Sequence, residues 1–432
     1  MRKSLLIGFG LVVATAVLAE EPAKKEESKG KVAPLIKLIF SSKAEAPADK
    51  PKTPPLPTGT HETTKTTSVK GETKGLKLQT LCSGSDGMVY ALLGSDRYGD
   101  KVSSGEVQVF DTAGEKIRGW KLNFQGQAIN CAPNGTVYVA GDGKIAAFDA
   151  EGHIKSESDL PFVKTLLGDV DKIKKKAEEQ RQSEIQSAEE QVKEFKKEAD
   201  EIRKKDEDKR TDTEKSQLKR NESMAKVYEQ MLERAKKKSV DDMVGQTTSR
   251  LKAVNAVAAT DKDLFVVSGE MKGYGYAVWR MDPSFDNAKQ VMSGLRGCCG
   301  QMDIQCCDDC LVVAQNCDHN VGKYDREGKK ISTFGKRAGR DDTDGFGSCC
   351  NPMNVRAGAE GRVYTAESEG IVRVFDKDGK QEGVIGTVKV SGGCKNVAIA
   401  VSADGNTVWF CDQPNSKIHV MTRKVESAKA VN

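Results

Sequence analysis

The sequence predicts an all-β protein, a six-bladed β-propeller, that carries an inserted α-helical antiparallel coiled-coil hairpin. Three observations predict this fold. A unit of short alternating strands and glycine turns recurs six times, no single unit has enough strands to bury both of its faces, and a long charged stretch separates the second copy from the third. The clearest copy, residues 347–380, places strands at 353–357, 363–366 and 371–375.

The N-terminus has the pattern of a secretory signal peptide. A basic start precedes an apolar run over residues 5–18 and a small-residue cleavage site at Ala19. We therefore expect residues 1–19 to direct export to the periplasm or the extracellular space, with no other transmembrane segment. Residues 20–75 are rich in Lys, Glu, Pro and Thr, which predicts a disordered tether.

The six copies align on their apolar residues and turn glycines. Their first hairpins span 78–92, 127–141, 255–269, 302–316, 353–367 and 397–412. A period of about 40–50 residues with about four strands per unit is the signature of a propeller blade. The alignment places blades 1 and 2 in residues 76–164, blades 3 to 6 in 246–423, and a C-terminal tail in 424–432.

The last two copies resemble the NHL repeat. In the last copy Asp404-Gly405 precedes a strand, and the sequence FCDQPNSKI follows at 410–418. Blade 5 is similar through Glu360-Gly361 and the sequence VRVFD at 372–376. The resemblance implies a propeller that is used mostly for binding, in a family with a few enzymatic members.

Closure of the ring requires an outer strand for the last blade, because an unpaired edge strand exposes backbone hydrogen-bonding groups. Only nine residues follow Arg423, whereas residues 62–70 alternate Thr or Ser with charged residues just ahead of blade 1. We therefore expect the segment 62–70 to supply the outer strand of blade 6.

The insertion, residues 165–245, contains 21 basic and 21 acidic residues. Apolar residues at steps of three and four predict two heptad helices, with a turn over 206–211 and a capping box formed by Thr211 and Glu214. The predicted seam consists of Ile185, Ala188, Val192, Phe195, Ala199 and Ile202 and of Leu218, Asn221, Ala225, Tyr228, Leu232 and Ala235.

This balanced charge argues against a nucleic-acid-binding arm. The weak seam leaves two interpretations open, an arm for a partner or for self-association and an ornament whose seam is satisfied internally. Because the insertion lies between two blades, we expect it to project from the face that bears the cysteine doublets.

Twelve cysteines in an exported protein predict disulfides. Hairpin register brings Cys317 near Cys298 or Cys299, and Cys411 near Cys394. Cys307 and Cys310 flank a two-residue turn, a spacing that fits either a small turn disulfide or a redox-active CxxC pair.

A sharper alternative is a soft-metal or thiol redox site at the mouth of the channel. Copper, zinc or an iron–sulfur cluster would suit such thiolates. The candidate ligands are Cys298, Cys299, Cys349, Cys350, Cys394 and His319. Cys349 and Cys350 have no cysteine opposite them in their own blade, which favours them as the reactive thiols, but a spacing of about 10 Å between packed sheets argues against ligation from separate blades.

The enzymatic interpretation has less support. Asp318, Glu367 and Asp412 fall in equivalent loops, where they could line a calcium or substrate site or could cap strand ends. Four histidines are too few for the three-histidine zinc site of the amidating lyases that share NHL repeats, and gluconolactonase-like acidic clusters have no match.

The sequence thus favours an exported, non-enzymatic scaffold that binds a protein or peptide on its loop face. A metal-binding or thiol redox protein is the alternative, and a propeller hydrolase or lyase is the third.

Overall fold

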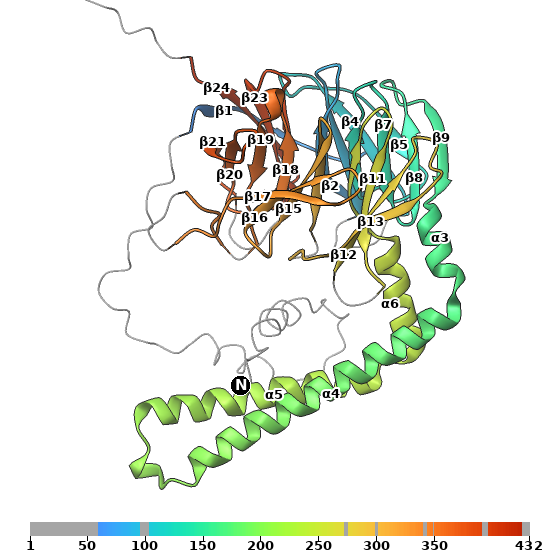
Figure 1. Ribbon diagram of the computed structural model, residues 1–432. Helices are drawn as coiled ribbons and strands as arrows, with labels where there is room; N and C mark the ends of the chain where they lie inside the picture. The colour runs from blue at the N-terminus through green and yellow to red at the C-terminus, as the bar shows by residue number, and fades with distance from the viewer. Residues whose placement is uncertain are drawn as a thin grey trace, which may run out of the picture. The chain divides into compact units, whose positions relative to one another are not determined.

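The computed structural model describes residues 59–95, 103–271, 275–298, 301–339, 344–348, 350–390 and 396–425. Within these residues the strands form six four-stranded antiparallel sheets, which are the six blades of a β-propeller (Figure 1). The predicted fold class is confirmed. The predicted signal peptide and most of the tether lie outside the described residues.

Blades 1 to 5 are each built from four consecutive strands, and blade 6 combines three consecutive strands with the N-terminal strand; the strands are named here from the inner to the outer one. Blade 1 contains β2 (Leu76–Ser83), β3 (Val89–Ser95), β4 (Gly105–Phe110) and β5 (Lys116–Leu122). Blade 2 contains β6 (Ala128–Cys131), β7 (Val137–Gly141), β8 (Lys144–Phe148) and β9 (Ile154–Asp159). Blade 3 contains β10 (Val254–Ala259), β11 (Leu264–Gly269), β12 (Tyr276–Met281) and β13 (Lys289–Leu295). Blade 4 contains β14 (Asp303–Cys307), β15 (Cys310–Gln315), β16 (Asn320–Asp325) and β17 (Lys330–Phe334). Blade 5 contains β18 (Asn354–Ala357), β19 (Val363–Ala366), β20 (Ile371–Phe375) and β21 (Gln381–Thr387). Blade 6 contains β22 (Val397–Val401), β23 (Thr407–Asp412) and β24 (Lys417–Arg423), and β1 (His61–Ser68) completes it as the outer strand.

The turn from the third strand to the outer strand has a recurring cause in the sequence. In blade 5 the Asp376 carboxylate accepts a hydrogen bond from the backbone N–H of Lys380 at 2.9 Å, and Gly379 adopts φ +86°. Equivalent Asp-x-x-Gly turns begin at Asp111, Asp149 and Asp325. The carboxylate satisfies a turn N–H and glycine supplies the left-handed backbone, so these four residues fix the hairpin.

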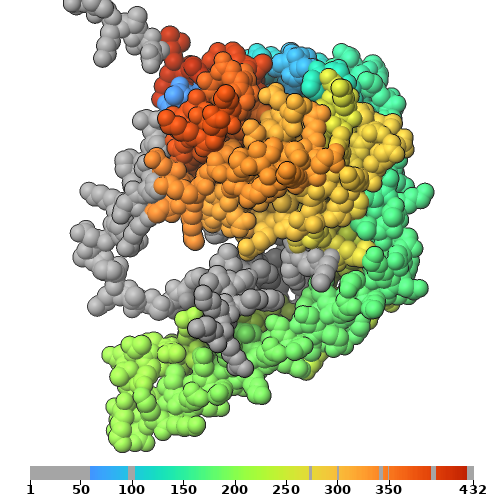
Figure 2. Space-filling model, viewed as in Figure 1, coloured from blue at the N-terminus to red at the C-terminus, as the bar shows by residue number. Residues whose placement is uncertain are grey.

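Six apolar clusters fill the spaces between neighbouring blades. Strands near the ring axis are buried on both faces, whereas outer strands such as β9 and β17 are largely exposed. The cluster between blades 6 and 1 contains the fully buried side chains of Leu78 and Trp409. The packed blades present a continuous surface on the side shown in Figure 2.

The N-terminal strand β1 closes the ring, as predicted. It pairs antiparallel with β24 from His61 opposite Arg423 to Ser68 opposite Lys417. His61 also contacts blade 6 through its ring Nε2, which lies 3.0 Å from the Gly405 carbonyl. The propeller therefore begins at His61, inside the range that the composition assigned to the tether.

The insertion is an antiparallel helical hairpin on two shorter stem helices. Its elements are α3 (Pro161–Gly168), α4 (Val170–Arg203), α5 (Asp212–Lys237) and α6 (Val240–Lys252), which extend beyond the predicted range 165–245 at both ends. Thr211 and Glu214 form the predicted capping box at the start of α5. Phe195 of α4 stacks on Tyr228 of α5, with 5.6 Å between the ring centroids, so the two predicted seams face each other.

The stem joins blade 3 through apolar contacts. Phe162 of α3 stacks on Trp279 of β12 with ring centroids 4.6 Å apart, and Leu251 of α6 is fully buried. Because α6 leads into the start of β10, the hairpin connects to the face at which the inner strands begin, which we call the entry face. Among the described residues, no helix combines the length and apolar character needed to span a membrane.

Candidate functional site

The entry face brings together sulfur atoms from two blades. Cys298 precedes β14 of blade 4 and Cys350 precedes β18 of blade 5, and their Sγ atoms lie 2.8 Å apart. The side chain of Cys317, in the β15–β16 turn, lies near Cys298 and interacts with its thiol. We call Cys298, Cys317 and Cys350 the sulfur cluster.

A buried asparagine positions Cys298. The side-chain amide oxygen of Asn316 accepts a hydrogen bond from the backbone N–H of Cys298 at 2.7 Å. The side-chain NH2 group of Asn316 donates to the backbone carbonyl of Gln301 at 3.0 Å. Asn316 is fully buried and immediately precedes Cys317. One side chain therefore fixes the Cys298 turn beside the strand connection that carries Cys317.

The loop that carries Cys350 is held by an acidic network. The Glu367 carboxylate accepts hydrogen bonds from the Gly347 N–H at 2.9 Å and from Arg373 Nε at 2.6 Å, and the Asn351 amide donates to Glu369 at 2.6 Å. Because Glu367 and Arg373 are buried, their ion pair is a rigid support for this loop.

His319 ties the two loops together. It adopts φ +54°, is buried, and places Nε2 3.0 Å from the carbonyl oxygen of Ser348. This contact joins the Cys317 turn of blade 4 to the Cys350 loop of blade 5. The histidine is thus near the sulfur cluster, as the sequence predicted, and one of its ring nitrogens contacts the backbone.

Burial controls the chemistry of these thiols. It raises the pKa of Cys317 to about 11, and the neighbouring Cys298 thiol adds to the effect. Cys350 is fully buried. Because the thiolate is the nucleophile, a thiol with a raised pKa reacts slowly with small electrophiles, whereas a neighbouring sulfur in contact remains within reach for disulfide formation.

The structure settles only some of the cysteine predictions. Cys307 and Cys310 form the turn disulfide, with Cα atoms 5.1 Å apart. Cys317 contacts Cys298, one of its two predicted partners, as a thiol. Cys411 is fully buried as a thiol, and its predicted partner Cys394 lies outside the described residues, as do Cys299 and Cys349.

The three predicted acidic residues play different roles. Glu367 is fully buried in its pair with Arg373, and burial raises its pKa although Arg373 opposes the rise. Asp412 is buried at the end of β23, and although burial opposes the change, the His419 ring 3.7 Å away and a hydrogen bond from Asn415 at 2.7 Å lower its pKa. Asp318 lies near the surface, 3.5 Å from Arg296. Within the described residues, none of the three carboxylates contacts another one of the set, and each supports local structure.

Polar side chains cross the central channel, a feature that the sequence analysis missed. Arg356 of β18 pairs with Asp303 of β14 at 2.7 Å and donates to the Leu81 carbonyl of β2 at 3.2 Å. Asn130 of β6 donates to Gln305 of β14 at 2.8 Å. The Arg356–Asp303 pair joins adjacent blades, whereas the bonds of Arg356 to Leu81 and of Asn130 to Gln305 connect non-adjacent blades, so protein atoms occupy the channel at this level. The signal that could have found them is a charged residue in an otherwise apolar inner strand.

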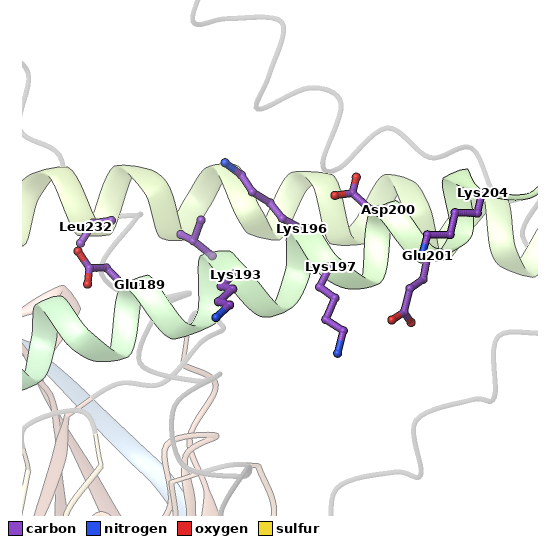
Figure 3. A pocket seen from close by; sticks show the side chains of 9 residues that line it. Glu189, Lys193, Lys196, Lys197, Asp200, Glu201, Lys204 and Leu232 are labelled. Carbon is purple, nitrogen blue, oxygen red and sulfur yellow. The ribbon is translucent and has the colours of Figure 1, made fainter.

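The helical hairpin carries a groove with a volume of about 580 Å³. Its lining residues are Glu189, Val192, Lys193, Lys196, Lys197, Asp200, Glu201, Lys204 and Leu232. Lys196 pairs with Glu229 at 2.7 Å, whereas Lys193 and Lys197 point away from α5 (Figure 3). Within the described part of the chain, Lys193, Lys197 and Lys204 make no ion pair. The groove therefore joins apolar carbon from Val192 and Leu232 to four lysines and three carboxylates, a lining with a net charge of +1.

Metal ligation at the mouth stays a prediction. No group of three or more His, Cys, Asp or Glu side chains among the described residues is arranged to hold a metal ion. Half of the predicted ligand set, Cys299, Cys349 and Cys394, lies outside those residues.

No family model matches the sequence, and no curated protein sequence matches it. Among solved structures, the chain is similar to a calcium-binding protein, regucalcin, from Agrobacterium tumefaciens (12% identity, TM-score 0.43, 82% of this chain and 92% of that chain covered). It is also similar to the Pan2 WD40 domain of Neurospora crassa (9% identity, TM-score 0.41, 86% and 98% covered) and to a protein of unknown function from Bacteroides caccae (11% identity, TM-score 0.40, 77% and 88% covered). The fold assignment rests on the strand pairing of this chain itself.

Proposed function

We propose that this chain is an exported NHL-type propeller scaffold that binds a protein partner, and that the hairpin groove holds an acidic segment of that partner. The observation that carries the proposal is the groove lined by α4 and α5, where Lys193, Lys197 and Lys204 occur together with the apolar side chains of Val192 and Leu232. Acidic side chains would pair with the lysines, and apolar ones would cover the exposed carbon.

The cross-channel bonds support a binding site on the surface. Arg356 bonds to Leu81 and Asn130 to Gln305 across the ring, so we infer that a ligand binds on the loops or the hairpin. The helices are joined by interhelical ion pairs such as Arg203 with Glu222 at 2.7 Å, so the hairpin holds its shape without a partner.

The test uses a photo-activated cross-linking amino acid at position 197 in the full chain, purified from its native source. The same amino acid at position 226, an exposed lysine of α5, is the control. We expect one partner to be captured from position 197 and not from position 226, with cross-links in an acidic stretch of the partner.

Charge reversal then tests the chemistry. The triple variant K193E/K197E/K204E should weaken binding of the captured partner at least tenfold, whereas K215E/K219E/K226E, which changes as much charge on α5, should bind as the wild type does. Equal capture from both positions, or equal loss in both triple variants, refutes the groove as the site. Capture of a second copy of this chain would instead assign the groove to self-association.

A second function, thiol redox exchange, is favoured by the sulfur cluster. If Cys298 is oxidised with Cys317, the Cys350 thiolate can attack the Cys298 Sγ atom, form a Cys298–Cys350 bond and release Cys317 as a thiolate that takes up a proton. The starting disulfide requires an oxidised thiol compound as oxidant. The 2.8 Å contact between the Cys298 and Cys350 sulfurs supports this exchange.

Non-reducing peptide mapping of protein equilibrated with oxidised and reduced glutathione tests the exchange. In the wild type we expect the tryptic peptide 297–323 to be linked to peptide 341–356, which joins blades 4 and 5. C298S and C350S should abolish the link, whereas the adjacent variants C299S and C349S should keep it. A link that survives C298S or C350S refutes the assignment.

A further inference from the structure

The first three blades contain only two of the twelve cysteines, Cys82 and Cys131. Cys82 lies near the end of β2 in blade 1, and Cys131 is the last residue of β6 in blade 2. Their Sγ atoms lie 3.4 Å apart. Two cysteines about 50 positions apart in sequence therefore meet across a blade junction.

The surroundings of the pair are apolar and well packed. Cys82 is 2% exposed and belongs to the cluster between blades 1 and 2, against which Cys131 also packs. Tyr90, opposite Cys82 in the β2–β3 register, is held by a 2.7 Å hydrogen bond from its hydroxyl to Asp86. Because Cys82 is buried, a thiol outside this chain cannot easily reach its sulfur, whereas the Cys131 sulfur is already in contact with it.

The structure assigns Cys82 and Cys131 as a disulfide that joins blade 1 covalently to blade 2. A disulfide bond is about 2.05 Å long, so the sulfurs must approach by about 1.4 Å, which small side-chain rotations supply. The pair lies where the inner strands end, on the face opposite the sulfur cluster. This site is independent of the hairpin groove and of the exchange proposed for Cys298.

The bond forms by two exchange steps with an oxidised low-molecular-weight disulfide. Cys131, the more exposed thiol, loses its proton and attacks one sulfur of that disulfide, which gives a mixed disulfide and one reduced thiol. Cys82 then loses its proton, attacks the Cys131 sulfur and releases the second reduced thiol. Two protein thiols are oxidised and one small disulfide is reduced to two thiols.

The bond should be structural and slow to exchange. Burial raises the pKa of the Cys131 thiol, and the hydrogen bond and charge of Cys82 add to the rise. A low thiolate fraction slows both oxidation of the pair in the folded protein and attack by external thiols. We therefore expect the bond to form during folding and to resist reductants until the protein unfolds.

Peptide mapping gives a direct test, because each cysteine lies in a tryptic peptide without another cysteine. The protein is exported into a bacterial periplasm, or refolded with oxidised and reduced glutathione, then denatured with an alkylating agent and digested. We expect peptide 78–97 linked to peptide 122–144, and both peptides released by reduction. Recovery of the two peptides alkylated and unlinked, or linked to other cysteines, overturns the proposal.

Stability measurements on variants give a second test that does not depend on the digest. Closing a loop of about 50 residues should change the unfolding equilibrium constant by up to about a thousandfold. C82S, C131S and the double variant should show the same loss under non-reducing conditions, because each removes the same bond. C306S, which changes a half-buried thiol of β14, is the matched control and should keep the wild-type cross-link. If the stability losses of C82S and C131S add up in the double variant, the proposed disulfide is wrong.

Discussion

Replacement of Arg356 by Met tests whether its buried ion pair with Asp303, which joins blades 4 and 5, supports the ring. Arg356 and Asp303 are 6% and 7% exposed, and the substitution leaves the Asp303 carboxylate buried without its cationic partner. Breaking a buried pair from one side costs about 3–5 kcal/mol. The Asn354 amide and the Val355 N–H, at 2.6 and 2.9 Å from the same carboxylate oxygen, would remain as donors, so we expect a loss near the lower value.

The loss should depend on pH in a defined direction. Burial raises the pKa of Asp303, and Arg356 opposes this rise, so R356M should raise the pKa of Asp303 further. A carboxyl group whose pKa is higher in the folded state destabilises the fold as the pH rises through the interval between its unfolded and folded values. The difference in the free energy of unfolding between wild type and R356M should therefore be larger at pH 7 than at pH 5. It should narrow by up to about 1.4 kcal/mol for each pH unit below the pKa that Asp303 has in the variant.

Urea unfolding at pH 7 and pH 5 measures both quantities. With a slope of about 3 kcal/mol per molar, a loss of about 3 kcal/mol lowers the midpoint by about 1 M. The double variant D303N/R356M should recover most of the loss, because no charge stays buried. R362M removes an exposed arginine of blade 5 and should cost less than about 1 kcal/mol. A pH-independent loss, or a double variant that is less stable than R356M, refutes the ion-pair argument.

Three further predictions concern ring closure, thiol chemistry and the hairpin. Deletion of residues 59–70 removes the outer strand of blade 6 and should cause aggregation or early unfolding in a thermal melt, whereas deletion of residues 426–432 should not. In the reduced protein, alkylation of Cys317 should accelerate about tenfold per pH unit up to about pH 11, because its pKa is about 11 and only the thiolate reacts; a plateau near pH 9 would contradict this. F195A removes the ring that stacks on Tyr228, and losing this aromatic pair should lower the stability of the hairpin by about 0.5–1.5 kcal/mol. We expect a smaller helical signal in circular dichroism. Unchanged thermal melting of that signal would show that the hairpin seam does not depend on this pair.

The sequence could predict the blades because each one is specified locally. Alternating apolar residues set the two faces of each strand, and residues such as Asp376 and Gly379 fix the hairpin within a few positions. Ring closure was also predictable, since 62–70 alternates like an edge strand just ahead of blade 1. The Cys307–Cys310 disulfide follows from the same local logic, because a two-residue turn places these positions opposite each other.

Contacts between blades could not be predicted in the same way. Register within a hairpin says which residues of one blade are opposite each other, but it does not say which positions of two blades meet. The Cys298–Cys350 and Cys82–Cys131 contacts and the pair of Asp303 with Arg356 all depend on the packing of separate sheets. A partial signal existed, because Asp303 and Arg356 interrupt apolar inner strands and a buried charge requires a partner.

The sulfur cluster shows that the sheet spacing does not apply near the ring axis. A separation of about 10 Å holds for sheets that pack face to face, and it was the basis for arguing against metal ligation from separate blades. Blades of a ring converge toward the axis, and Cys298 and Cys350 lie in loops next to the inner strands, where their sulfurs reach 2.8 Å. Residues at the axial ends of neighbouring blades can therefore share a bond or a ligand, whereas residues of outer strands cannot. This geometry makes the inner-strand ends, where Cys82 and Cys131 also lie, the positions at which cysteines can join one blade to the next.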